Sequence, residues 1–271
     1  ELGDSTAQVR SEIPDVSGFV TTDNDQQQLS VSATGDTLHL QNGGFVIIPG
    51  ISAANNSGSG GTATYPAGTV HCNSTPTAVV DVTNPSTGKT WMDRNLGASQ
   101  VATSSTDTAA YGDLYQWGRG ADGHQCRNSS TTSTLSSTDQ PGHGDFITTN
   151  SSVIGNDWRS PQNDNLWQGV NGTNNPCPSG YRLPTEAELD AERQSWSSNN
   201  SAGAFNSPLK LPAAGARDFI TASLDWVGTR GYYWASTVSG TEAYRLRFFG
   251  NLATVGYRNR LYGRSVRCIK D

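Results

Sequence analysis

The run at residues 244–249, Tyr-Arg-Leu-Arg-Phe-Phe, restricts the fold of this chain more than any other segment. Successive side chains of a strand point to opposite faces, so Leu246 and Phe248 share one side and the two arginines share the other with Phe249. The apolar side predicts burial in a core. The other side presents arginine and aromatic groups, the residue types that carry most binding energy at interfaces. Because residues 209–271 show no catalytic motif, we interpret this segment as a recognition surface.

The composition favours a loop-rich extracellular fold with short strands. Only 34% of the 271 residues are hydrophobic and 15% are charged, while glycine is abundant. The 7 Trp, 9 Tyr and 7 Phe are enough to build a core. A formal net charge of −6 argues against a general nucleic-acid binder, so we expect no nucleic-acid partner. No apolar run approaches the ~20 residues that cross a bilayer, so we expect no membrane insertion.

Composition also divides the chain into four parts. Residues 1–16 form a polar N-terminal segment, and residues 17–54 form a small unit rich in strand patterns. Residues 55–64 have the Gly/Ser composition of a flexible linker. Residues 65–271 are expected to fold as one larger domain.

The small N-terminal unit has the pattern of a β meander. Alternating or apolar runs at 29–32, 37–40 and 45–49 are separated by Gly-containing turns. A unit of this size buries too little surface to be stable alone. We therefore expect it to form a homotrimer, as a stalk or the cap of a fibre.

The larger domain is predicted to be of the α+β class. A hairpin is expected over residues 78–92, and residues 120–175 are expected to be mostly irregular. The clearest helix begins after Thr185, which forms a capping-box pattern with Glu188. The spacing of aromatic residues predicts a second short helix over residues 107–117.

Five strings in this domain resemble one known family. They are the segments 91–98 (WMDRNLGA), 111–119 (YGDLYQWGR), 177–185 (CPSGYRLPT), 231–236 (GYYWAS) and 265–268 (SVRC). Together they resemble the Fibrobacter succinogenes major paralogous domain, over residues 65–271. That family belongs to the C-type-lectin-like fold, in the branch that also contains formylglycine-generating enzymes. The resemblance therefore implies a C-type-lectin-like domain.

Members of this branch serve as variable proteins of diversity-generating retroelements, in which a C-terminal segment is mutagenised on a fixed scaffold. The resemblance implies that residues 209–268 are such a segment. The expected scaffold residues are Tyr233, Trp234, Ser236, Leu246, Phe248, Gly263, Val266 and Cys268. The expected ligand-binding positions, taken as an exposed set, are Arg217, Asp218, Phe219, Asp225, Trp226, Arg230, Tyr232, Glu242, Tyr244, Arg245, Arg247, Phe249, Thr254, Arg258, Asn259 and Arg264.

The N-terminal meander is similar to repeats in phage tail fibres and adhesins. This resemblance implies an extracellular setting, at the tip of a virion tail fibre or on a bacterial cell surface. The expected partner is a protein or glycan receptor on a host or target cell. Two other interpretations of the function stay open. They are an oxidase of the formylglycine-generating type and a fixed structural domain of a surface layer or fibre.

The four cysteines are far apart and form no CxxC pair, which suits two disulfides in an oxidising compartment. We expect Cys177 to pair with Cys268, because one precedes the predicted helix and the other lies on the last strand. Cys72 would then pair with Cys126. The alternatives are four reduced, buried thiols, or a redox-active pair of the oxidase type.

Neither a metal nor a cofactor is expected. The clusters at 23–25 (Asp-Asn-Asp) and 163–165 (Asn-Asp-Asn) lack the spacing of a calcium loop, and such residues usually make turns. No catalytic residues are assigned, and we expect the chain not to be an enzyme.

Overall fold

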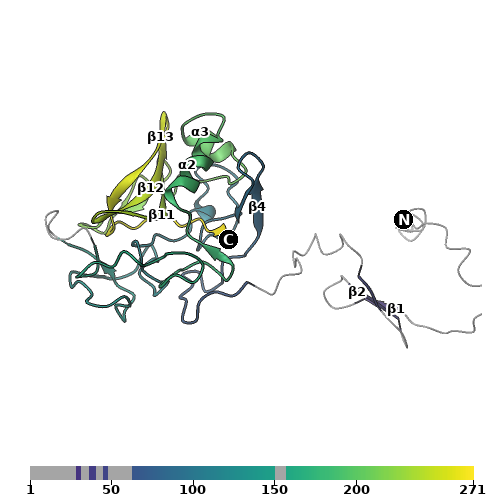
Figure 1. The fold of residues 1–271 in the computed structure, drawn as a ribbon, viewed down its shortest axis with the longest axis horizontal. Coiled ribbons are helices and arrows are strands. Elements are labelled where there is room, and N and C mark those ends of the chain that lie inside the picture. The colour runs from purple at the N-terminus through teal and green to yellow at the C-terminus, as the bar shows by residue number, and fades with distance from the viewer. Residues whose placement is uncertain (1–28, 32–36, 41–44, 48–62, 150–156) are drawn as a thin grey trace, which may run out of the picture. The chain divides into compact units, whose positions relative to one another are not determined.

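The fold is that of a computed structural model, which describes residues 29–31, 37–40, 45–47, 63–149 and 157–271. The chain divides into two compact units, residues 1–60 and residues 61–271 (Figure 1). The predicted polar segment 1–16 and most of the predicted linker lie outside the described residues.

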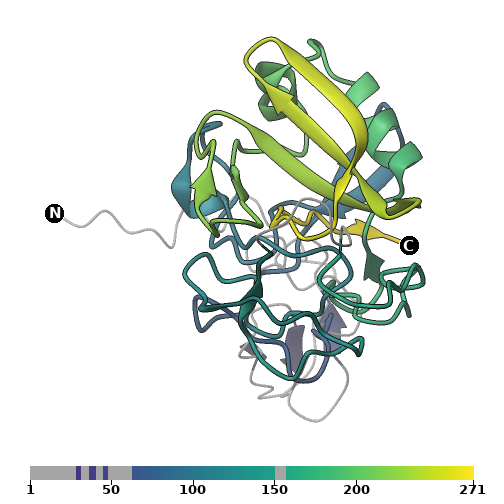
Figure 2. The same ribbon diagram turned by 90° about the vertical axis from the view of Figure 1, so that its left-hand side faces the viewer.

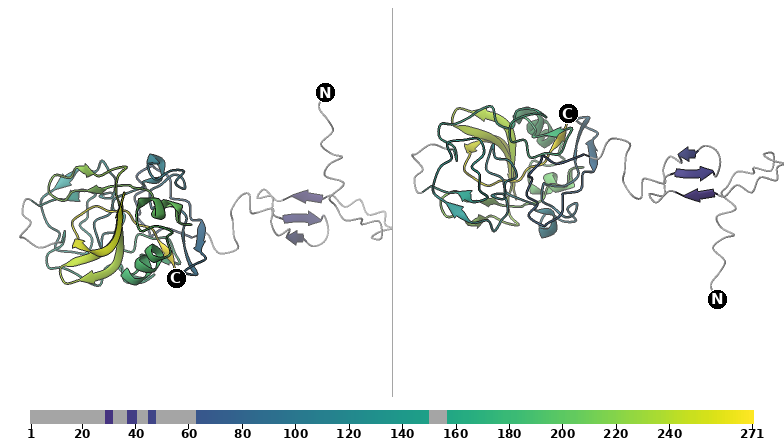
Figure 3. Two further views of the ribbon diagram at one scale, coloured as in Figure 1. Left: turned by 90° about the horizontal axis from the view of Figure 1, so that it is seen from above. Right: turned by 90° about the horizontal axis from the view of Figure 1, so that it is seen from below.

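The first unit contains the predicted meander. Strands β1 (Leu29–Val31), β2 (Thr37–Leu40) and β3 (Phe45–Ile47) form an antiparallel sheet in the order β1-β2-β3 (Figure 3). Leu29 lies opposite Leu40, and Thr37 lies opposite Ile47. The three strands therefore lie within the runs from which the sequence predicts them.

The second unit is mixed α+β, with more strand than helix. Its main sheet consists of β11 (Gly231–Ser239), β12 (Glu242–Phe249) and β13 (Leu252–Asn259), all antiparallel (Figure 2). A second sheet has the order β4-β5-β14-β8. Its strands are β4 (Asp81–Asn84), β5 (Lys89–Met92), β8 (Tyr181–Arg182) and β14 (Ile269–Lys270). The β4–β5 pair is the predicted hairpin, which begins three residues later than expected.

Two-residue strands complete the second unit. β6 (Thr131–Thr132) pairs in parallel with β7 (Phe146–Ile147), and β9 (Ala216–Arg217) pairs antiparallel with β10 (Leu224–Asp225). The described part of residues 120–175 is otherwise irregular, as predicted. Its two tryptophans are fully buried, and Trp158 Nε1 donates to the carbonyl of Trp117 at 2.6 Å. Buried tryptophans therefore hold this irregular region to the core.

Two short helices lie against the main sheet. Helix α2 (Glu186–Gln194) is capped by Thr185, and the reciprocal bonds with Glu188 form the predicted capping box. Helix α3 (Ser201–Asn206), which the sequence analysis did not predict, is capped by Asn200. Figures 1 and 2 show α2 beside strands β12 and β13, which it contacts.

The helix predicted over residues 107–117 is wrong. Only a single 3₁₀ turn forms there, η2 (Thr108–Ala110), with Asp107 as its N-cap. Gly112 then takes a φ of +66°, which ends any right-handed helix. The following amides donate to distant carbonyls: Tyr115 N–H to Arg264 and Trp117 N–H to Arg260.

The core has two clusters of buried side chains. The first contains the tryptophans at 117, 158, 167 and 234 together with Cys177 and Cys268. The second lies between the main sheet and the helices and contains Leu189, Tyr233, Leu246 and Phe248. All the expected scaffold residues are buried, including Leu246 and Phe248, for which the strand pattern predicts burial.

Both predicted disulfides are present. Cys72 bonds to Cys126 and Cys177 bonds to Cys268, so none of the four cysteines is free. Two disulfides indicate an oxidising, extracellular or secreted environment. Within the described residues, no helix is long and apolar enough to span a membrane.

Candidate functional site

The candidate site lies on one face of the main sheet. Alternation along β12 places Leu246 and Phe248 against the second core cluster and turns Arg245 and Arg247 to the opposite face. The register sets Arg247 between Tyr232 on β11 and Thr254 on β13. The sheet pairing therefore gathers residues from three strands onto one surface.

This surface contains a hollow of about 220 Å³. The hollow combines five arginines with three aromatic residues, and we call it the arginine hollow. It is lined by Trp226, Arg230, Tyr232, Arg245, Arg247, Arg258, Tyr262 and Arg264. Four of these residues lie outside the main strands: Trp226 and Arg230 precede β11, while Tyr262 and Arg264 follow β13.

Arg264 lies at the most buried position of the arginine hollow, with 3% of its surface exposed. Its guanidinium carbon is 4.9 Å from the ring centroid of Tyr232, 4.7 Å from that of Trp234 and 4.8 Å from that of Tyr262. Stacking on aromatic faces fixes the plane of the group but leaves its N–H edge unused. Both Nε and Nη1 of Arg264 are buried without a hydrogen-bond partner.

Arg245 is also buried, with 5% of its surface exposed, and its Nε has no partner. Its Nη1 makes one long bond of 3.4 Å to the carbonyl of Gly256, the residue opposite it on β13. A Cβ at position 256 would lie 3.5 Å from that same nitrogen. The absence of a side chain at Gly256 therefore leaves space beside the guanidinium.

No carboxylate neutralises the arginine hollow. Within the part of the chain that the structure describes, none of its five arginines forms an ion pair within 4.0 Å. Burial, followed by repulsion from Arg247 and Arg258, lowers the pKa of Arg245 to about 10. Burial, followed by repulsion from Arg245, holds the pKa of Arg264 well below its usual value.

Several predicted binding residues lie away from this hollow. Asp218 accepts hydrogen bonds from the amides of Ile220 and Thr221, and Asp225 accepts one from Ser223. Tyr244 packs against the second core cluster on the opposite face of the sheet. The predicted positions at the hollow are Trp226, Arg230, Tyr232, Arg245, Arg247, Arg258 and Arg264, with Phe249 stacked against two of these arginines.

The expectation that all these positions are exposed is wrong for three of them outside the hollow. Arg217 is buried because its guanidinium donates to carbonyls of Cys126, Ser129 and Ala222 and lies 4.4 Å from the ring centroid of Phe146. Phe219 packs edge-on against Tyr262 in the core. Asn259 is buried and accepts a hydrogen bond from the amide of Leu261.

Within the hollow, Tyr232, Arg245 and Arg264 are likewise buried rather than exposed, because neighbouring rings and guanidinium groups cover them. The sequence analysis missed Tyr262, which lines the hollow beside Arg264. The position of Tyr262 in the sequence, between Arg258 and Arg264, could have indicated that it belongs to the same surface. The exposed apolar residues Ile220, Leu224 and Val227, near the predicted Trp226 in the chain, were also not predicted.

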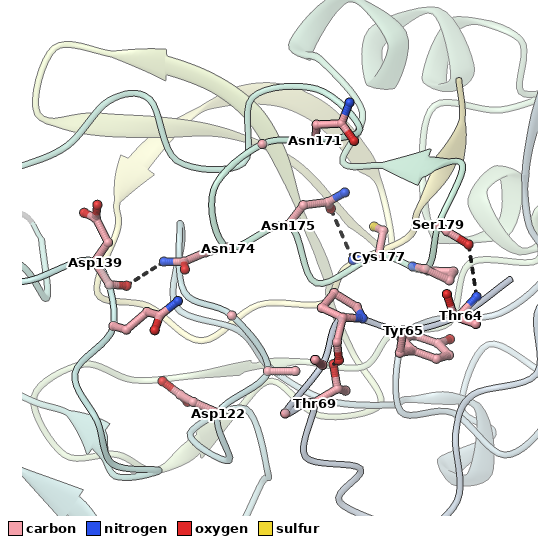
Figure 4. Close-up of a pocket in the computed structure, with 18 of the residues that line it drawn as sticks. Thr64, Tyr65, Thr69, Asp122, Asp139, Asn171, Asn174, Asn175, Cys177 and Ser179 are labelled. Atoms are coloured by element: carbon pink, nitrogen blue, oxygen red, sulfur yellow. Dashed lines mark hydrogen bonds between the residues drawn. The ribbon is translucent and has the colours of Figure 1, made fainter.

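A larger cavity of about 910 Å³ lies on another part of the second unit (Figure 4). Its polar groups bond to one another. Asn174 Nδ2 donates to the carbonyl of Asp139 at 2.6 Å, and Asn175 Oδ1 accepts from the amide of Cys177 at 3.1 Å. The Asp122 carboxylate is paired with Arg119 and His124. We therefore place the candidate site at the smaller hollow, where buried nitrogens of Arg245, Arg247 and Arg264 lack hydrogen-bond partners.

No group of three or more His, Cys, Asp or Glu side chains that could hold a metal occurs among the described residues. Of the two Asp/Asn clusters, 23–25 lies outside the described residues. In the other, Asp164 pairs with Arg260 at 2.6 Å and Asn163 donates to Asp139 at 2.9 Å. These side chains serve to connect loops.

In comparisons with known proteins, no family model, no curated protein and no solved structure matches this chain.

Proposed function

We propose that this chain is a receptor-binding protein that displays a variable surface on a C-type-lectin-like domain. The ligand is a protein or glycan receptor on a host or target cell, and binding involves no catalysis. The observation that carries this proposal is the two-sided main sheet. One face is committed to the core through Leu246 and Phe248, while the other carries the arginine hollow, in which several buried guanidinium nitrogens have no hydrogen-bond partner.

The proposed architecture explains how such a surface is presented. The N-terminal meander forms a homotrimeric stalk, at the tip of a virion tail fibre or on a bacterial cell surface. Three copies of the domain then share one support, and multivalency raises a weak single-site affinity by orders of magnitude. The two disulfides suit this extracellular setting.

The variable-surface proposal is tested by deep sequencing of the region that encodes residues 209–268 in the source population, together with the flanking DNA. We expect substitutions at adenine-templated codons, concentrated at hollow positions such as Trp226, Arg247 and Arg258. Buried scaffold positions such as Leu246 and Phe248 are the internal control and should be constant. A uniform 3′ end without a nearby template repeat would contradict the proposal and favour a fixed binding or structural domain.

A further inference from the structure

The arginine hollow concentrates positive charge in a chain whose net charge is −6. Five guanidinium groups converge on about 220 Å³, and none has a carboxylate partner in the described chain. Like charges held together in a partly buried site repel one another and raise the free energy of the unliganded protein. An anionic partner in the hollow lowers that cost.

The unpaired atoms of Arg264 and Arg245 point to the same kind of partner. Buried polar groups in native proteins almost always have a hydrogen-bond partner, and exceptions call for an explanation. Here Nε and Nη1 of Arg264 and Nε of Arg245 have none. The Nε–H and Nη1–H bonds of one guanidinium point in different directions, so these unpaired donors suit separate oxygen atoms of an oxyanion.

The five guanidinium groups of the hollow favour a group with more acceptor oxygens than a carboxylate has. One carboxylate can accept from one or two guanidinium groups, which would leave most of the five arginines uncompensated. A tetrahedral phosphate or sulfate ester presents three terminal oxygens in different directions, so it can accept from several guanidinium groups at once.

The exposed Trp226 at the hollow indicates which kind of molecule carries this ester. Trp226 is 41% exposed, and Arg230 lies 4.9 Å from its ring centroid. An open indole ring beside a cationic hollow can pack against the C–H face of a sugar while the charged substituent enters the hollow. We propose that the arginine hollow binds the phosphate or sulfate ester of an acidic saccharide, an inference that rests on the proposed receptor-binding function.

A nucleic acid is a poorer occupant, although it also carries phosphate. Nucleic-acid surfaces need a basic track that follows the backbone over many phosphates. Here the cations form one small hollow, and the adjoining segment exposes Ile220, Leu224 and Val227 instead.

The test is isothermal titration calorimetry on the full chain. The probes are a sulfated heparin tetrasaccharide with its desulfated counterpart, and glucose 6-phosphate with glucose. We expect at least one charged sugar to bind tenfold or more tightly than its neutral counterpart, and the preferred pair distinguishes sulfate from phosphate. Arg264→Gln and Arg258→Gln should each weaken that binding tenfold or more. Lys89→Gln, an exposed cation on β5, is the matched control and should leave it unchanged.

Arg258 is exposed, so its variant tests the site even where Arg264→Gln does not fold. The inference is overturned if no charged sugar binds, if neutral sugars bind equally well, or if both arginine variants bind as the wild type does. Tighter binding of an oligothymidylate or a phosphopeptide than of either charged sugar would also overturn it.

A parallel assay separates this inference from the proposed function. Labelled full chain is incubated with cells from the source community, with and without the charged sugars. Capture that neither the sugars nor Arg258→Gln reduces would sink the acidic-saccharide inference and leave receptor binding standing. Conversely, sugar binding in a chain whose 3′ end is uniform would leave the anion site standing without a variable surface.

Discussion

Two kinds of buried arginine occur in this domain, and the difference between them separates folding from binding. Arg267 is fully buried and donates to Asn95 Oδ1 at 3.1 Å and to the carbonyls of Met92 and Leu209 at 3.2 and 2.8 Å. Arg264 is equally buried but has no such acceptors at Nε and Nη1. The Arg267 side chain joins neighbouring segments, whereas the Arg264 side chain keeps unpaired donors that a ligand could use.

The same substitution at these two positions should therefore have different effects on stability. Arg267→Met leaves three acceptors without a donor, so we expect the free energy of unfolding to fall by about 3 kcal/mol or more. Arg264→Met removes an unpaired, desolvated cation, and we expect a small change or a gain, because the lost ring stacking is worth only about 1–2 kcal/mol. Urea unfolding of both variants measures the difference. Equal destabilisation would show that Arg264 is structural.

Asp113 provides a pH-dependent prediction at the same scale. Burial raises its pKa to about 7, although Arg127 opposes the shift. Since the unfolded carboxyl ionises near pH 4, the native state holds the proton more tightly, and this stability is lost as the pH rises through about 7. Asp113→Asn cannot ionise, so it should gain about 2–4 kcal/mol relative to the wild type between pH 4 and pH 8. The measurement is the difference in unfolding free energy at each pH, which cancels the other titrating groups. A difference that is constant with pH would contradict the prediction.

At the scale of elements, structure that depends on neighbouring residues could be predicted from the sequence. Structure that depends on contacts between distant residues could not. The alternation at residues 244–249 and the pattern of Thr185 with Glu188 depend on neighbouring residues, so both appear in the sequence and in the fold. The false helix at residues 107–117 had helical spacing, but the amides of Tyr115 and Trp117 donate to carbonyls more than a hundred residues away.

The candidate site divides in the same way. Its five arginines and two of its three aromatic residues, Trp226 and Tyr232, were predicted from the sequence. The burial of Arg217 could not be predicted, because its acceptors at Cys126 and Ser129 lie 91 and 88 residues away. The lack of a partner for Arg264 is equally a property of the assembled fold.

The capping box of α2 should support the sheet that carries the site. Thr185 Oγ1 accepts from the amide of Glu188 at 3.2 Å, and α2 contacts β11, β12 and β13. Thr185→Ala should lower the free energy of unfolding by about 1 kcal/mol, the usual cost of a lost N-cap. Thr134→Ala, at an exposed loop position, is the control and should change it by less than about 0.5 kcal/mol. Chemical denaturation followed by circular dichroism compares the two, and equal effects would argue against a stabilising cap.

At the scale of the whole molecule, the two disulfides should differ in reactivity. Cys72 and Cys126 are partly exposed, while Cys177 and Cys268 are 2% and 0% exposed. Thiol–disulfide exchange requires access to a sulfur atom, so mild reduction of the folded protein should open the Cys72–Cys126 bond first. Alkylation followed by mass spectrometry identifies the order. Simultaneous labelling of all four cysteines without denaturant would contradict it.

The proposed stalk predicts the assembly state. Residues 1–271 should have three times the mass of a single chain in light scattering coupled to size-exclusion chromatography. The matched control is the second unit alone, residues 61–271, which should be monomeric. A monomeric full chain would rule out the trimeric stalk while leaving the sheet surface unaffected.

The two faces of β12 make strand length a stricter constraint than residue identity. Deleting one residue before Arg245 would shift the pairing with β13 and exchange the inward and outward sets, driving guanidinium groups into the space of Leu246 and Phe248. Replacing an outward residue leaves that register intact. Evolution of this surface is therefore expected to proceed by amino-acid substitution at constant strand length. Insertions that survive should fall in the turns at residues 240–241 and 250–251, where the chain reverses without a partner strand to misalign.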